Sequence, residues 1–327
     1  MARLKEYNGH YCESEYEYAF IGFLEAEGWK YSSGNNISRV TKRDVLIADD
    51  FKKFIADTNP DLTEDEVTKI YDNVRLVGAE SDFATLHKVY GWMVNGVQFT
   101  PQDELPRMIP LIDFDNWNKN IFRVVNQFTV EYTNNGQKEN RRPDVLLFVN
   151  GIPLCVIELK NPTDANATIY DAWEQINIRY WRDIPHLLHY CPLACISDGV
   201  KTRLGTVRTP YEHFYAWRRV NEGDAVSTLP FAETETMIKG VYSPERFLEI
   251  FRDYIYFQDS IYDSDEQEIV CRYPQIIYVF LTIFLYLLKC PQSLILSALR
   301  AFCFCGKPHI SRSIFLYFRY QAWLKSW

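Results

Sequence analysis

The sequence predicts an α/β (α+β) fold, in which helices flank a mixed central β-sheet. Two apolar, β-prone runs, 145–149 and 154–157, are joined by the hairpin-type turn Asn150-Gly151. A helical pattern over 166–182 separates this hairpin from another buried-type strand at 193–197. Strands interrupted by a helix that must pack on them favour a mixed sheet with helices on its faces.

Length, composition and charge bound the class of protein. The chain has 327 residues, of which 47% are hydrophobic and 24% charged, and its formal net charge is −8. It is therefore globular and long enough for two or three domains, and its acidity argues against indiscriminate coating of nucleic acid. The eight cysteines show no paired zinc-binding spacing, and the chain begins without a secretory signal pattern. We expect reduced thiols and a cytoplasmic location.

The first part of the chain is predicted to be mostly helical. Residues 13–27 have an amphipathic pattern that ends at Gly28. Its apolar stripe consists of Tyr16, Phe20, Phe23 and Leu24. Helical patterns continue from Arg43 to about Tyr90, and Thr63 begins one of these helices with a capping-box sequence.

The middle of the chain is predicted to build the sheet. Strands are expected at 121–132, 145–149, 154–157, 193–197, 201–207 and 214–217, with a turn at Asn134-Asn-Gly. The first three of these strands are expected to lie side by side and antiparallel. The helix at 166–182 is expected to pack through Ile169, Ala172, Trp173, Ile176 and Tyr180. A further helix is expected from Pro244 to about Tyr256.

Charged residues converge at one end of the predicted hairpin. Asp144 opens its first strand, and Glu158 and Lys160 close its second strand, two residues apart and therefore on one face. Because the strands are antiparallel, Asp144 is expected beside Glu158 and Lys160. Two carboxylates facing one ammonium leave an acidic excess that suits a hard divalent cation such as Mg²⁺. The alternative is a surface ion pair at a strand end.

The C-terminal tail differs in character from the rest. Between Ile276 and Leu288 only Thr282 is polar, and a second apolar stretch, 294–305, is interrupted by Arg300. The first stretch is shorter than the ~20 residues that a membrane-spanning helix needs. Three interpretations are open: a membrane segment, buried helices, or a non-native tail produced by a change of reading frame near residue 275. The loss of acidic residues after Glu268 favours the non-native tail.

Several segments resemble a known family. The order Arg142-Pro-Asp, then Glu158-Leu-Lys fourteen residues after the Asp, resembles the PD-(D/E)xK nuclease motif. Residues 10–275 as a whole resemble the N-terminal region of the restriction (R) subunit of type I restriction–modification enzymes. The other segments that carry this resemblance are Ile112-Asp-Phe, Asn126-Gln-Phe, Asn150-Gly-Ile-Pro-Leu, Asp183-Ile-Pro, Ser197-Asp-Gly, Gly205-Thr and Arg272-Tyr-Pro-Gln.

The resemblance implies a restriction-endonuclease-like core that cuts duplex DNA with Mg²⁺. Asp144, Glu158 and Lys160 match the family's catalytic residues, and Glu17 matches the acidic residue of its first helix. Asp144 and Glu158 would then hold Mg²⁺, with Glu17 as an outer-shell or third acidic partner and the Leu159 carbonyl as a further ligand. Lys160 would orient the attacking water.

DNA contacts are expected from basic residues near the site and from the helix that follows it. Arg142 and Arg179 would contact phosphates, which supply affinity without reading sequence. The family carries a Gln followed four residues later by a Tyr, whereas here Gln175 and Tyr180 are five apart. We therefore expect that this pair does not share one helical face, although both residues remain candidates for DNA contact.

The resemblance also sets expectations about domains and partners. We expect an endonuclease-like domain at 1–220 with a helical insertion at about 43–95, a linker and helix at 221–275, and the anomalous tail at 276–327. Methyltransferase and specificity subunits are the expected protein partners, and no membrane is expected. The family's ATP-driven motor would need a Gly-x-x-x-x-Gly-Lys-Ser/Thr segment, which this sequence lacks, so we expect a truncated subunit without an ATP site. The alternative function is a catalytically idle docking or DNA-binding module.

Overall fold

The computed structural model describes residues 13–78, 80–160, 168–221, 223–226, 231–258 and 267–270. The apolar tail at 276–327, with its three interpretations, lies outside these residues. Within the described part of the chain, no helix has the length and apolar character needed to cross a membrane.

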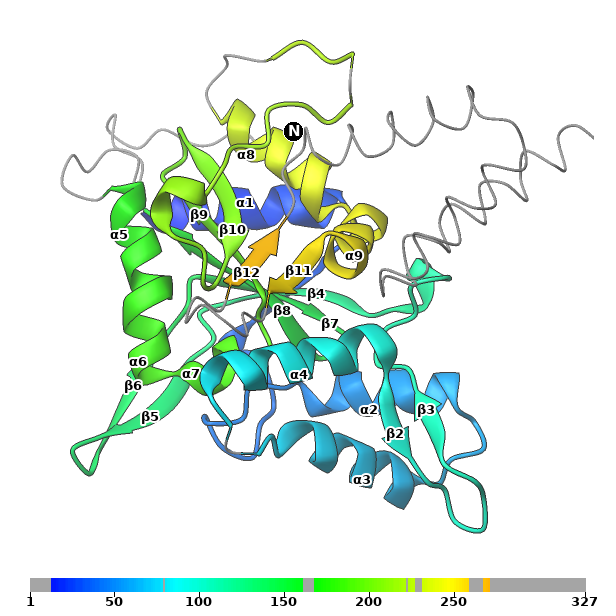
Figure 1. The fold of residues 1–327 in the computed structure, drawn as a ribbon. Coiled ribbons are helices and arrows are strands. Elements are labelled where there is room, and N and C mark those ends of the chain that lie inside the picture. Colours follow the sequence, from blue (N-terminus) through cyan, green and yellow to red (C-terminus); the bar gives the residue numbers. More distant parts are fainter. Residues whose placement is uncertain are drawn as a thin grey trace, which may run out of the picture. The chain divides into compact units, whose positions relative to one another are not determined.

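A mixed six-stranded sheet lies at the centre of the fold, as the sequence predicts (Figure 1). Its strands, in spatial order, are β1 (Lys30–Ser33), β4 (Phe122–Asn126), β7 (Val145–Val149), β8 (Ile152–Leu159), β9 (Leu193–Ser197) and β10 (Thr202–Thr206). The β1–β4 and β8–β9 pairs are parallel, and the other neighbours are antiparallel. Every residue of β7, β8 and β9 is buried, which explains their uninterrupted apolar sequences, because helices cover both faces.

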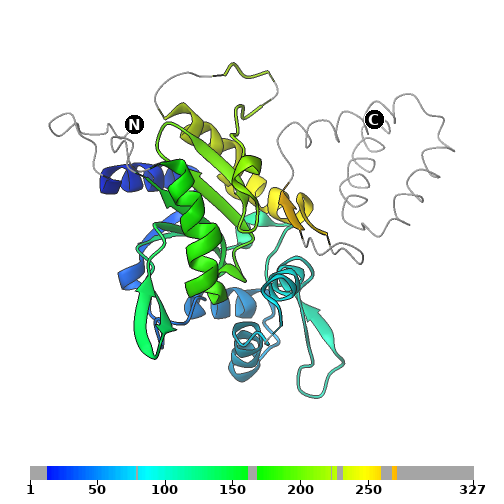
Figure 2. The same ribbon diagram turned by 60° about the vertical axis from the view of Figure 1, so that its left-hand side comes forward.

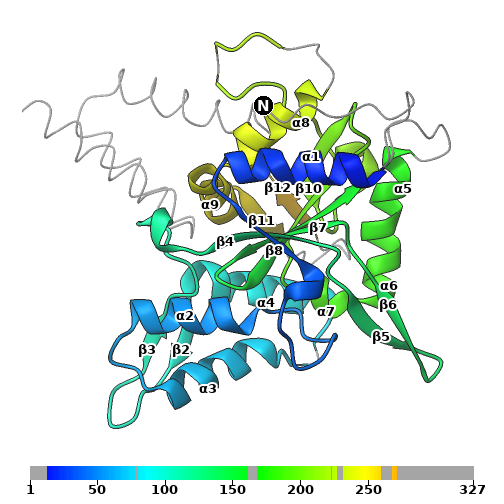
Figure 3. The ribbon, with the colours of Figure 1, turned by 180° about the vertical axis from the view of Figure 1, so that it is seen from behind.

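The two faces of the sheet are covered by different helices. Tyr16 of α1 (Glu13–Ala26) contacts Ser197 of β9, and the Cys155 thiol of β8 meets Tyr242 at the end of η5 (Ile238–Tyr242). Alternation along β8 and β9 puts Glu158 and its paired neighbour Ile196 on the opposite face. That face carries α5 (Ile169–Glu174) and its continuation through η3 (Gln175–Tyr180) and α6 (Trp181–Asp183). Figures 2 and 3 show the α5–α6 helix in front of the sheet and, from behind, α1 lying along it.

The helical insertion packs at the end of the β7–β8 hairpin farthest from Asp144. It consists of α2 (Ala48–Thr58), α3 (Glu64–Arg75), α4 (Asp82–Asn95) and the small hairpin of β2 (Val97–Phe99) and β3 (Arg107–Ile109). The Ile47 N–H donates to the Gly151 carbonyl at 2.8 Å, and a Cβ on Gly151 would overlap the Ile47 carbonyl. The predicted capping box of Thr63 and Glu66 is present at the start of α3. The insertion therefore supports the hairpin turn and leaves the charged end uncovered.

The structure corrects two of the expected strands. The strand expected over 121–132 is interrupted at Gln127, whose φ of 55° ends β4, and the chain then enters β5 (Val130–Asn134). β5 pairs with β6 (Gln137–Arg141) through the expected turn, where Asn135 and Gly136 both have positive φ. The strand expected at 214–217 is wrong: η4 (Tyr211–His213) precedes a single bridge between Tyr215 and Leu204.

The segment after residue 230 packs onto the core rather than extending away from it. It contains α8 (Ala232–Met237), η5, α9 (Pro244–Asp253), β11 (Ile255–Gln258) and β12 (Gln267–Val270). The Trp29 indole N–H donates to the Tyr242 carbonyl at 2.6 Å, and the Tyr90 hydroxyl donates to the Phe251 carbonyl at 2.9 Å. The helix expected to reach Tyr256 therefore ends at Asp253, where the chain turns into β11.

Candidate active site

Asp144 and Glu158 meet at the ends of β7 and β8, as the hairpin prediction requires. Val145 pairs with Ile157, so Asp144 lies directly beside Glu158. The Asp144 Oδ2 atom accepts a hydrogen bond from the Leu159 N–H at 2.8 Å. This bond fixes the carboxylate of Asp144 against the end of β8. The proposed role of the Leu159 carbonyl as a metal ligand stays a prediction.

The Glu158 carboxylate is buried and only half satisfied. Its side chain has no exposed surface, and its Oε1 atom accepts a hydrogen bond from the Tyr180 hydroxyl at 2.6 Å. Its Oε2 atom is buried without a hydrogen-bond partner among the described atoms. Burial, followed by the nearby charge of Asp144, raises the pKa of Glu158 well above its ordinary value, and Lys160 and Tyr180 oppose this shift. Because the ionised carboxylate is disfavoured in this position, a cation bound beside it would stabilise the charged form.

Lys160 is connected to Glu158 by a relay of side-chain hydrogen bonds. The Lys160 ammonium donates to Gln175 Oε1 at 2.9 Å, and Gln175 Nε2 donates to the Tyr180 hydroxyl at 2.8 Å. The Tyr180 hydroxyl in turn donates its hydrogen bond to Glu158 Oε1. Each donor in the relay points toward Glu158, so the relay stabilises the ionised carboxylate and fixes the position of the ammonium.

The relay depends on a π-helical turn in place of the regular α-helix that was expected over 166–182. Gln175 to Tyr180 form η3, a π-helical segment inserted between α5 and α6. In such a segment residues five apart lie one above the other, and the Gln175–Tyr180 hydrogen bond follows from this spacing. The expectation that the pair cannot share one helical face is therefore wrong, because it assumed regular α-helix.

Glu17 approaches Asp144 from the other face of the sheet. The Asn126 amide donates to Glu17 Oε1 at 2.6 Å, and Asn126 pairs with Val145, whose side lies opposite to that of Asp144. Burial raises the pKa of Glu17, and the hydrogen bonds from Asn126 and Gln127 oppose that shift. No three His, Cys, Asp or Glu side chains within the described residues form a metal-ligand cluster. The part of Glu17 in a metal site with Asp144 and Glu158 stays a prediction.

The expected DNA-contacting residues fall into two groups. Arg142 and Arg179 are exposed, and Arg179 is paired with Glu174 at 2.6 Å. Tyr180 is fully buried with its hydroxyl committed to Glu158, so its expected contact with DNA does not fit the structure. Gln175, half-buried, is occupied by Lys160 and Tyr180. Both side chains are therefore hydrogen-bonded within the carboxylate site, and contact of Gln175 with DNA stays a prediction.

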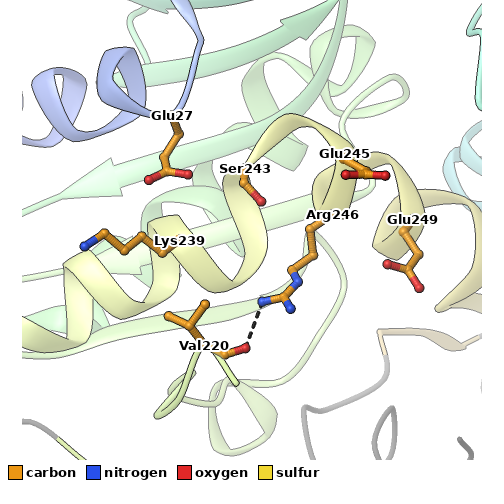
Figure 4. Close-up of a pocket in the computed structure, with 7 residues that line it drawn as sticks. All are labelled: Glu27, Val220, Lys239, Ser243, Glu245, Arg246 and Glu249. Carbon is orange, nitrogen blue, oxygen red and sulfur yellow. Dashed lines mark hydrogen bonds between the residues drawn. The ribbon is translucent and has the colours of Figure 1, made fainter. Parts of the chain in front are cut away.

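An open surface pocket elsewhere on the fold does not include these residues. It lies between the end of α1, η5 and the start of α9 (Figure 4). Its lining residues are Glu27, Val220, Lys239, Ser243, Glu245, Arg246 and Glu249. The Arg246 guanidinium donates to the Val220 carbonyl at 2.8 Å, and the Lys239 ammonium pairs with Glu235 at 2.6 Å. Three carboxylates against two cations disfavour binding of DNA phosphates in this pocket.

A mixed sheet that presents Asp, Glu and Lys at adjoining strand ends defines a nuclease-like α/β core. A family model described as the N terminus of the type I restriction enzyme R protein matches residues 11–213. The chain belongs to this family, as its sequence segments indicated.

Curated relatives of this chain are named as endonuclease subunits of type I restriction enzymes. The putative type I restriction enzyme MjaIXP endonuclease subunit of Methanocaldococcus jannaschii is 31% identical over 284 residues, which are 79% of this chain and 26% of that protein. The type I restriction enzyme HindI endonuclease subunit of Haemophilus influenzae is 30% identical over 265 residues, which are 76% of this chain and 24% of that protein. The chain thus spans about a quarter of the length of these relatives.

Two further residues, Asn126 and Gln127, lie at the site without a role predicted from the sequence. Asn126 and Gln127 were noted only as part of a family-like segment, yet their amides hold the Glu17 carboxylate. An Asn-Gln pair at the end of a predicted strand is a weak signal by itself. What marks these two residues is the pairing of β4 with β7, which places them beside the start of β7 at Asp144.

Proposed function

We propose that this chain carries the nuclease site of a type I restriction enzyme and hydrolyses phosphodiester bonds of duplex DNA. The observation that carries the proposal is the buried Oε2 atom of Glu158, which has no hydrogen-bond partner among the described residues and lies beside the carboxylate of Asp144. A structural ion pair would place a cationic side chain against that oxygen. The Lys160 ammonium instead donates to Gln175, which leaves the oxygen available to a ligand.

The residues fit a hard divalent cation, for which we propose Mg²⁺. Asp144 and Glu158 would hold it through carboxylate oxygens, the ligands that Mg²⁺ prefers, and water would complete its coordination. When bound, Mg²⁺ supplies Lewis-acid polarisation of the scissile phosphate. Glu17, on the other face, would act on this site from outside the first ligand shell.

The chain's own residues have separate roles around the scissile phosphate. Lys160, fixed by Gln175, would hold the attacking water and stabilise the charge that develops on the phosphate oxygens. Tyr180 orients Glu158 by donating to Oε1, and this hydrogen bond favours the ionised form without cancelling the effect of burial on the pKa of Glu158. Arg142 would contact a neighbouring phosphate from the exposed strand entry.

The proposed setting is a restriction–modification complex in the cytoplasm. Methyltransferase and specificity subunits are the proposed protein partners, since the relatives are named as endonuclease subunits of type I restriction enzymes. Cys155, Cys191 and Cys195 are buried free thiols, which suit a reducing compartment. We propose no ATP site within this sequence, because it has no phosphate-binding segment of the Gly-x-x-x-x-Gly-Lys-Ser/Thr type.

Calorimetric titration with Mg²⁺ and supercoiled-plasmid cleavage test the proposal together. We expect the full chain to bind Mg²⁺, Asp144→Asn to abolish binding, and Lys160→Ala to preserve binding while lowering cleavage by at least 10²-fold. Lys53→Ala is the control, because Lys53 is an exposed partner of Asp57 on α2. A chain that binds no Mg²⁺ would overturn the proposal and favour a catalytically idle docking module. Equal cleavage by all the variants would also overturn it.

A further inference from the structure

Gln127 directly follows the last residue of β4, and it contacts Asp144 through its backbone and Glu17 through its side chain. Its φ of 55° places it in the left-handed region, which a Gln residue adopts at an energetic cost. Its backbone N–H donates to the Asp144 carbonyl at 3.2 Å. The backbone of Gln127 is therefore bound to the residue that opens β7.

The side chain of Gln127 reaches to the other face. Its Nε2 atom donates to Glu17 Oε2 at 2.9 Å and to Oε1 at 3.2 Å, so one amide contacts both oxygens of the carboxylate. Asn126 adds a third donor at 2.6 Å, and Asn126 itself accepts from the Tyr31 hydroxyl at 3.0 Å. Gln127 alone in this group contacts both Glu17 and Asp144.

The shape of this turn is held by close packing from outside. Gly34, at the start of η1 (Gly34–Asn36), lies against the backbone of residues 126–128. A Cβ on Gly34 would come within 2.7 Å of the Gln127 carbonyl oxygen and the Phe128 Cα atom. Neither atom belongs to a flexible side chain, so any larger residue at position 34 must displace the turn.

We propose that Gln127 is a positioning residue, which holds the Glu17 carboxylate near Asp144 where β4 ends and β7 begins. The inference rests on the proposed Mg²⁺ site, and it assigns to Gln127 the connection between Glu17 and that site. At its left-handed φ of 55°, the N–H faces Asp144 at the start of β7 while the side-chain amide faces Glu17 of α1. Gly34 keeps the turn in place.

The test is a double-substitution cycle measured by Mg²⁺ calorimetry on the full chain. Gln127→Gly removes the amide but keeps the left-handed backbone, and we expect it to weaken Mg²⁺ binding about tenfold. In a Glu17→Gln background the same change should have no further effect, because Gln127 acts through Glu17. Asn135→Gly is the matched control, since Asn135 has a φ of 48° in the exposed β5–β6 turn and should leave Mg²⁺ binding unchanged.

A second pair of variants tests the packing of the turn without changing the side-chain amide of Gln127 or Asn126. Gly34→Ala should weaken Mg²⁺ binding in the same direction as Gln127→Gly, whereas Gly91→Ala, where an added Cβ meets no atom within 4 Å, should not. Thermal melting of each variant separates loss of folding from loss of positioning. A purely structural Gln127 would change the melting temperature and leave the Mg²⁺ dissociation constant unchanged, which would overturn the inference. So would additive effects of Gln127→Gly and Glu17→Gln.

These outcomes are distinct from failure of the proposed function. If the unmodified chain binds Mg²⁺ and Asp144→Asn abolishes binding, the metal site stands whatever Gln127 does. If Gln127→Gly then has no effect, only the positioning role is lost. If the unmodified chain binds no Mg²⁺, both the proposed function and the positioning role are overturned.

Discussion

Gln175 and Tyr180 are hydrogen-bonded at 2.8 Å across a separation of five residues, through the π-helical turn η3. This contact joins the residue that holds Lys160 to the residue that holds Glu158. π-Helical turns are uncommon and cost stability, and they are found frequently at functional sites. Here the turn brings both side chains to one position at the end of the sheet.

Tyr180→Phe tests the support of the buried carboxylate. The change keeps the ring but leaves both oxygens of Glu158 without a donor among the described atoms, so unfolding free energy should fall by about 1–3 kcal/mol. Cleavage should also fall by tenfold or more, because the carboxylate loses its orientation. Chemical denaturation and plasmid cleavage measure the two effects. Tyr190→Phe is the control: it removes a buried bond of 2.6 Å to the Val74 carbonyl and should cost stability alone.

Gln175→Ala tests the position of the Lys160 ammonium. Without its acceptor the ammonium becomes mobile, so kcat should fall about 10–100-fold with little change in KM for DNA. Gln175→Glu should restore the acceptor for Lys160 but not the donor to Tyr180, and should therefore recover only part of the activity. Ile178→Ala, at an exposed position of the same turn, should have no effect. A change in KM alone would show that Gln175 contacts DNA directly.

Arg142→Ala tests the proposed phosphate contact. Loss of one phosphate contact should reduce the slope of log affinity against log salt by about 0.9. Fluorescence anisotropy with a duplex in Ca²⁺ in place of Mg²⁺ measures this slope without cleavage. Arg179→Ala should change it less, because the guanidinium is already paired with Glu174. Equal slopes for the unmodified chain and Arg142→Ala would place the DNA path elsewhere.

His186 gives a prediction for stability at acid pH. Burial lowers the pKa of His186 from its ordinary 6.5 to about 4, so the folded chain keeps the ring neutral where the unfolded chain protonates it. Stability from this group is present above pH 6.5 and is lost as the pH falls toward 4. At pH 5 the loss should be about 1–2 kcal/mol, or several degrees in melting temperature. His186→Phe should remove this part of the loss, and His213→Gln, at an exposed position, should not.

The sequence predicted the core of the site because its determinants are local. The Asn150-Gly151 turn between two apolar runs joins β7 and β8 as antiparallel neighbours, and a one-residue register shift between Leu147 and Phe148 then brings Asp144 opposite Glu158 rather than Ile157. The capping box at Thr63 and the turn at Asn135 are local in the same sense. The turns and the capping box are each specified within a few residues of chain, whereas the register shift in the β7–β8 hairpin was not predicted.

Features that depend on contacts between distant segments could not be predicted in this way. The break at Gln127 requires Gly34 packed against the turn and Glu17 within reach of the amide, and these residues are far apart in sequence. The π-helical turn is favoured by the hydrogen bonds that Lys160 and Glu158 make with its side chains. The family spacing of four residues led to the opposite expectation.

The sequence by itself determined the mixed sheet, the charged hairpin end and the family to which the chain belongs, because turn chemistry, apolar periodicity and motif order are written in neighbouring residues. Only the tertiary structure decided which side chains serve that hairpin end. It placed Tyr180 and Gln175 on Glu158 and Lys160, and it placed Glu17 on the opposite face, connected through Gln127. The physical reason is that a buried carboxylate is stabilised by whichever donors the packed fold brings to it, and packing brings together residues that the chain keeps apart.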